Sequence, residues 1–139
     1  MITAVDTNII VALWDSDPAT SSAARSALDS ALERGSLVIC PPVFAELIAA
    51  PGRTENFLDS FFRSTGMRID WAMNENTWRS AGRAFQAYAA RRRKQAGVPR
   101  RILANFLIGA HALDGGHCLL TLDAHFYRTA FPALSLVRV

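Results

Sequence analysis

Short apolar runs alternate with helix-like segments along this chain, and that alternation limits the folds open to it. The run at residues 2–5 lacks the polar alternation of a half-exposed strand, so it predicts a buried strand. Two more strands are expected at 36–40 and 118–122. Shorter strands are expected at 67–69 and 134–137. Strands that alternate with helices are typical of an α/β domain with a mainly parallel sheet, here of four or five strands.

The segments between these runs have helical patterns and recognisable helix ends. Asp17-Pro18 offers a capping side chain and a first-turn proline, and Gly35 ends the same helix. Trp71 and Trp78 are expected in the core, whereas Trp14 is the better candidate for an exposed contact. A short helical turn and five helices are expected over residues 9–14, 17–34, 43–50, 54–64, 74–94 and 102–113.

The chain's length of 139 residues predicts a single domain, residues 1–139, with a core of its own. Cys40 and Cys118 border β-like runs without metal-like spacing, which favours buried thiols in a reducing compartment. No apolar run reaches the roughly 18 residues of a membrane span, and no basic region precedes the apolar start as in a secretory signal. We therefore expect a cytoplasmic protein without a membrane partner.

Charge is distributed unevenly along the chain. Residues 1–78 carry a net charge of −5 and residues 79–139 a net charge of +8, and arginine supplies 14 of the 15 basic residues. This split favours an acidic partner, such as nucleic acid or an acidic protein segment. The alternative for the basic stretch is a solvated helix end, where cations suit the helix dipole. The candidate RNA contacts are Arg91, Arg92, Arg93, Lys94, Arg100 and Arg101.

Three carboxylates occupy positions where a parallel sheet gathers its chemistry. Asp6 follows the first predicted strand and Asp123 follows the run at 118–122, and ligands bind outside the carboxyl ends of such strands. Each aspartate alone is explained equally well as a helix cap or turn residue. Glu46 is the only charge between Arg34 and Arg53, in an apolar helix. It requires a cation, an arginine partner or a narrow solvated face.

Asn105 is a fourth oxygen donor, on the helix expected at 102–113. Gly109 follows it by one turn, and these two residues by themselves are better explained by a polar helix surface with a packing glycine. Together with the three carboxylates, Asn105 forms an oxygen-only donor set that suits Mg²⁺ or Mn²⁺ rather than Zn²⁺. Clustered carboxylates repel one another until a cation relieves the repulsion, and a divalent ion can activate water against a phosphodiester.

Four segments carry a family resemblance: VDTNIIVAL at 5–13, PPVFAEL at 41–47, RRILANFLIGAHAL at 100–113 and LLTLDAHFYRTAFPALSLV at 119–137. In this order and spacing the chain resembles PIN-domain ribonucleases, specifically the VapC toxins of bacterial toxin–antitoxin pairs. The resemblance implies a PIN-like α/β/α sandwich. It also implies that Asp6, Glu46, Asn105 and Asp123 occupy the catalytic metal site, with Thr7, Asn8 and Thr121 as supporting residues.

The resemblance has further implications for activity and partners. It implies an endoribonuclease dependent on Mg²⁺ or Mn²⁺ that leaves a 5′-phosphate on its RNA substrate. It implies a VapB-type antitoxin that inserts a segment into the acidic groove. It also implies a homodimer, and binding to operator DNA only through the toxin–antitoxin complex.

Asn105 departs from the family pattern, because the family has aspartate in the corresponding D-F-L-I-G-A-H-A segment. An amide keeps an oxygen ligand but loses the negative charge, so we expect weakened metal binding and reduced or absent activity. Natural variation and a deliberate inactivating change both remain open explanations. The alternative function is a catalytically dead PIN-like module that binds RNA or the antitoxin. A phosphotransferase with Asp6 as nucleophile is disfavoured, because Asn8 stands where its acid–base aspartate belongs.

The three histidines, His111, His117 and His125, form no pair with metal-like helical spacing. We expect none of them to act in catalysis. His111 belongs to the G-A-H-A segment and is expected to be a packed or hydrogen-bonded structural residue.

Overall fold

The protein is built around a parallel sheet with helices on both faces. The computed structural model describes residues 1–139, apart from the side chain of Arg138. The elements are β1 (Ile2–Val5), α1 (Thr7–Leu13), α2 (Pro18–Arg34), β2 (Ser36–Ile39), α3 (Pro41–Ala49), α4 (Glu55–Thr65), β3 (Arg68–Ile69), α5 (Glu75–Lys94), α6 (Leu103–Asp114), β4 (Cys118–Thr121), α7 (Ala124–Ala130) and β5 (Leu136–Arg138).

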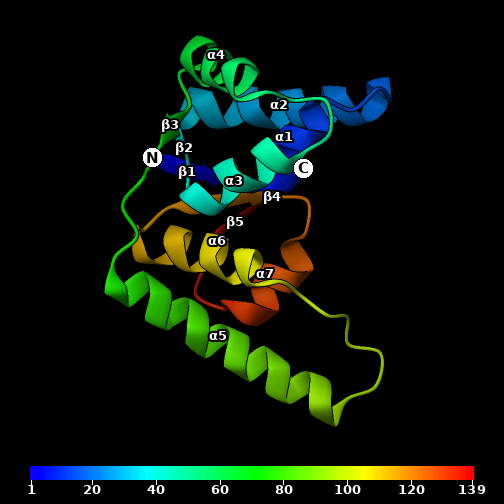
Figure 1. Ribbon diagram of the computed structural model, residues 1–139, viewed down its shortest axis with the longest axis vertical. Helices are drawn as coiled ribbons and strands as arrows, with labels where there is room; N and C mark the ends of the chain where they lie inside the picture. Colours follow the sequence, from blue (N-terminus) through cyan, green and yellow to red (C-terminus); the bar gives the residue numbers. More distant parts are fainter.

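The sheet has five strands in the order β3-β2-β1-β4-β5, and every described pair is parallel. Figure 1 shows α1, α2 and α4 on one side of the sheet and α6 and α7 on the other, with α5 packed outside α6. The prediction of a PIN-like α/β/α sandwich with a mainly parallel four- or five-stranded sheet is confirmed.

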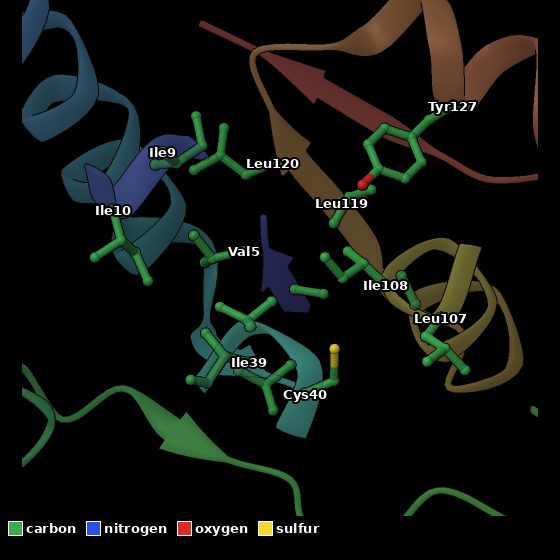
Figure 2. Packing of buried hydrophobic residues seen from close by; sticks show 14 of the residues in the cluster. Val5, Ile9, Ile10, Ile39, Cys40, Leu107, Ile108, Leu119, Leu120 and Tyr127 are labelled. Carbon is green, nitrogen blue, oxygen red and sulfur yellow. The ribbon is translucent and has the colours of Figure 1, made fainter. Parts of the chain in front are cut away.

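The predicted buried runs form the centre of the sheet. In β1, β2 and β4 the last three residues of each strand are buried, because helices cover both faces. Figure 2 shows Val5, Ile39 and Leu119 of these strands with Ile108 of α6 and Tyr127 of α7. The core therefore lies directly beneath the strand ends that carry Asp6 and Asp123.

Several helix ends follow from their sequences. The Asp17 side chain accepts a hydrogen bond from the Thr20 amide at 3.1 Å, and Pro18 occupies the first turn of α2. Gly66 ends α4 with a left-handed φ of 71°. Gly109 has a packing role, because a Cβ there would lie 2.3 Å from the Phe131 ring. The glycine thus lets α6 approach the segment that follows α7.

The structure differs from the sequence predictions at several places. Helix α7 was not predicted, and the last strand begins at Leu136 rather than at residue 134. Trp71 and Trp78 were expected in the core but are 61% and 50% exposed. Trp71 lies in the connection before α5, and the helical spacing of Trp78 gave no information about which residues another element would cover. None of the described helices has the length and apolarity needed to cross a membrane.

Trp14 is half-buried instead of freely exposed. Its ring makes edge-on contacts with Phe57 and Phe61 of α4, at centroid distances of 5.5 and 5.2 Å. The Arg53 guanidinium lies 4.7 Å from the same ring. The side chain therefore ties the end of α1 to α4.

Candidate acidic metal centre

Asp6 is the most buried member of the acidic group. It follows β1, has 5% of its surface exposed and accepts a hydrogen bond from the Thr121 hydroxyl at 2.8 Å. Burial raises the pKa of Asp6 most strongly, and the charge of Glu46 raises it further. Hydrogen bonds from Thr121 and Tyr127 oppose this increase. Asp6 is thus a carboxylate whose negative charge a nearby cation would stabilise.

Glu46 reaches the same region from α3. Its side chain is half-buried, and the Thr7 hydroxyl donates a hydrogen bond to Glu46 Oε1 at 2.6 Å. Thr7 directly follows Asp6, so this contact fixes α3 against the start of α1. From the sequence, the charge of Glu46 required a cation, an arginine partner or solvent. In the structure its partner is the hydroxyl of Thr7, next to the carboxylate of Asp6.

Two polar residues join the turns after β1 and β4. Asn8 Oδ1 accepts a hydrogen bond from the Leu122 amide at 3.2 Å. Thr121 Oγ1 accepts one from the Asp123 amide at 2.9 Å while it donates to Asp6. Thr121 therefore connects two of the three acidic residues. The supporting positions assigned to Asn8 and Thr121 on resemblance are hydrogen-bonding positions in the structure.

Asp123 already has a cationic partner from this chain. Arg101 Nη1 lies 2.6 Å from Asp123 Oδ2, and the two side chains are 26% and 33% exposed. The Arg101 guanidinium also lies 4.5 Å from the Phe126 ring. Arg101 was predicted as an RNA contact, but its guanidinium is directed to the acidic centre. The sequence gave no signal for this pair, which joins the loop before α6 to the turn after β4.

The other predicted basic residues lie at or beyond the end of α5. Arg91 stacks at 5.0 Å on the Tyr88 ring, and Arg92 Nε donates to the Val98 carbonyl at 3.3 Å. Arg93, Lys94 and Arg100 are exposed. This basic group therefore has side chains available to a partner on the side of the molecule that carries α5.

Asn105 occupies the first turn of α6 and is half-buried. Helix α6 packs against α3, the helix that carries Glu46, and against β4, the strand before Asp123. Its place on α6 is compatible with the fourth position of the site.

The donor set fits a hard divalent cation. Asp6, Glu46 and Asp123 offer carboxylate oxygens, which Mg²⁺ and Mn²⁺ prefer. Burial raises the pKa of the nearby Cys40 thiol to about 12, and the negative charges of Asp6 and Glu46 act in the same direction. Cys40 therefore remains a protonated thiol. The donors that this region offers are therefore carboxylate oxygens and not a thiolate.

The sequence pattern of the PIN domain family matches residues 3–132. The chain belongs to the PIN domain family. No curated protein sequence matches it significantly. Its fold is similar to that of several solved toxin–antitoxin complexes.

VapBC2 from Rickettsia felis, bound to a DNA fragment from its promoter, matches with a TM-score of 0.72 and 19% identity, over 100% of this chain and 99% of that one. VapBC-1 from nontypeable Haemophilus influenzae matches with a TM-score of 0.67 and 22% identity, over 99% of this chain and 98% of that one. FitAcB from Neisseria gonorrhoeae matches with a TM-score of 0.63 and 17% identity, over 98% of this chain and 96% of that one. At these identities, the likeness shows a shared PIN fold.

Sequence reasoning missed Tyr127, which neighbours Asp6. Burial raises the pKa of its hydroxyl, and the charge of Asp6 raises it further, so Tyr127 remains a hydrogen-bond donor. Figure 2 shows the Tyr127 hydroxyl pointing inward toward the sheet. The available signal was its place one helical turn after Asp123, which is the cap of α7.

Proposed function

We propose that this PIN domain is a metal-dependent endoribonuclease toxin of the VapC type, attenuated at its metal site by Asn105. The observation that carries the proposal is the convergence of Asp6 and Glu46, whose charges interact, with Thr121 linking Asp6 to Asp123. Membership of the PIN domain family, over residues 3–132, supports a nuclease and a single domain.

In this proposal Asp6, Glu46 and Asp123 hold Mg²⁺ or Mn²⁺. The ion, when bound, supplies electrostatic stabilisation of a phosphodiester and activation of water for its hydrolysis. Thr121 orients Asp6, and Thr7 orients Glu46. Asn105 contributes a neutral amide oxygen where a carboxylate would bind the ion more strongly.

The charge distribution supports an RNA substrate. The exposed Arg93, Lys94 and Arg100 offer contacts to phosphates beyond the acidic centre. Contacts of this kind give an affinity that falls as the salt concentration rises. An RNA substrate also fits a protein that acts in the cytoplasm.

The proposed partner is a VapB-type antitoxin. The similar folds belong to toxin–antitoxin complexes, one of them bound to promoter DNA. Three apolar side chains next to site residues in the sequence are exposed: Ile102 at 59%, Leu103 at 44% and Leu122 at 51%. An antitoxin segment that covers them would also block the acidic centre. By the same analogy, we propose a homodimer that meets operator DNA only through the antitoxin.

The test is RNA cleavage by the full chain and by Asn105→Asp, with Mn²⁺, with Mg²⁺ and with a chelator. We expect weak or undetectable cleavage by the chain itself and metal-dependent cleavage by Asn105→Asp that ends in 5′-phosphates. Asp123→Asn in the Asn105→Asp background is the matched control and removes the gain.

A second candidate function rests on Asn105 itself, since the missing charge favours a catalytically dead module that binds RNA or the antitoxin. Absence of cleavage by both the chain and Asn105→Asp, with RNA binding intact, would favour this module and refute the enzyme. Equal cleavage by both proteins would instead refute the attenuating role of Asn105.

A further inference from the structure

A second group of metal-type ligands shares no residue with the acidic centre. Asp70, His111 and His117 each present one ligand atom, and these atoms lie within 4.8 Å of one another. Asp70 follows β3, His111 is on α6, and His117 is next to the first residue of β4. Figure 1 shows the segment from β3 to α5 running past the end of α6 from which the chain turns into β4. The group therefore connects the segment after β3 to the end of α6 and the turn before β4.

The geometry is already close to that of a metal centre. His111 is 5% exposed, and its Nε2 lies 2.9 Å from Asp70 Oδ2. Ligand atoms bound to one tetrahedral Zn²⁺ at 2.0–2.2 Å lie about 3.4 Å apart, so small side-chain rotations close the site. The Asp70 side chain is 29% exposed, which leaves one side of the group open to solvent.

The position of the second histidine also fits a bound cation. The His117 ring lies where a side chain at Gly115 would stand, since a Cβ there would be 2.4 Å from His117 Nε2. Glycine at this position allows His117 to face His111, with ring centroids 5.7 Å apart.

The proposed ligands lie among other charged groups. Burial lowers the pKa of His117, and the nearby His111 lowers it further, whereas the charge of Asp70 raises it. Asp70, whose pKa is lowered chiefly by its hydrogen bond to His111, supplies the negative charge. Arg68 faces both Asp70 and His117 and opposes a cation.

We propose that Asp70, His111 and His117 form a structural Zn²⁺ site, with water as the fourth ligand. Two imidazoles and a carboxylate suit Zn²⁺, whereas the oxygen-only acidic centre suits Mg²⁺ or Mn²⁺. The ion ties the β3–α5 connection to α6 and to the start of β4. This site is separate from the proposed nuclease centre and does not depend on nuclease activity.

The test is calorimetric titration of the metal-free full chain with Zn²⁺, with Co²⁺ absorption as a probe of four-coordinate geometry. We expect one equivalent of Zn²⁺ and a higher Tm with the metal. His117→Ala should weaken binding by about tenfold or more. Gly115→Ala, which keeps all three ligands but displaces the His117 ring, should also weaken it.

Two controls separate this site from others. His125→Ala removes an exposed histidine on α7, and Asp6→Asn removes a carboxylate of the acidic centre. Both variants should keep the Zn²⁺ affinity of the parent chain. Unchanged affinity in His117→Ala, or loss of binding in Asp6→Asn, would overturn the proposal. Circular dichroism of each metal-free variant shows whether a lost affinity reflects the ligand or the fold.

Discussion

The Arg101–Asp123 pair should compete with a divalent ion at the acidic centre. Arg101 holds the Asp123 carboxylate at 2.6 Å, so an ion that uses this oxygen has to displace the guanidinium or bind beside its positive charge. Replacing Arg101 by glutamine removes that charge while keeping a polar, although shorter, side chain. We therefore expect Arg101→Gln to bind Mn²⁺ more tightly than the parent chain.

The size of the effect follows from the burial of the pair. Exposed ion pairs contribute about 0.2–1 kcal/mol, and hydrogen bonds to charged groups about 1.5–3 kcal/mol. With side chains 26% and 33% exposed, the pair lies between these classes, and solvent screening reduces its contribution to about 1 kcal/mol. That free energy corresponds to a Mn²⁺ affinity about fivefold higher in Arg101→Gln.

The assay is direct titration with Mn²⁺ in the absence of RNA, with the signal of the free ion followed by electron paramagnetic resonance. Without RNA, any loss of phosphate contacts by the variant does not influence the result. Arg100→Gln is the matched control, because it removes the same charge from the exposed neighbouring residue. An equal gain in both variants would attribute the effect to net charge. No gain in Arg101→Gln would refute competition between the arginine and the ion.

Three further changes test the packing and charge of the site. Asp6→Asn should raise Tm at pH 7–8, because the raised folded-state pKa of Asp6 makes its ionised form oppose folding. Thermal melts should show this gain shrinking once the pH falls below the folded-state pKa and vanishing near the ordinary value of 3.8, and a constant gain would contradict it. Gly109→Ala should lower the free energy of unfolding by about 1–3 kcal/mol, because the added methyl group collides with the Phe131 ring. Gly82→Ala, in open space on α5, is the control and should not lower it, and denaturant unfolding compares the two variants. Thr121→Val should cost about 1–3 kcal/mol in the same assay, since Asp6 loses its donor and the Asp123 amide its acceptor, and an unchanged midpoint would refute the linking role.

Local patterns in the sequence determined most of the fold. The short apolar runs at β1, β2 and β4 predict strands, the first of them buried, and the structure buries the last three residues of each. Asp17 and Gly35 predict the two ends of α2, because a capping carboxylate and a C-terminal glycine act on the adjacent turn of backbone. These signals are reliable because their cause and their effect lie within a few residues of each other.

The carboxylates of the candidate site were also predictable, but the contacts between them were not. Asp6 and Asp123 follow strands, and parallel strands end at the same edge of a sheet, so their proximity follows from the strand pattern. The exposed Trp78 on α5 shows the limit of such reasoning, because helical spacing does not identify the face that another element covers.

The sequence by itself thus determined the α/β architecture, the family and the candidate acidic residues. Tertiary structure alone decided that Arg101 pairs with Asp123, that Tyr127 neighbours Asp6, and that Asp70 meets His111 and His117. These contacts join residues that are distant in the chain or lie on a helix that the pattern did not predict. Their distances depend on how helices and loops pack around the sheet, which no local pattern encodes.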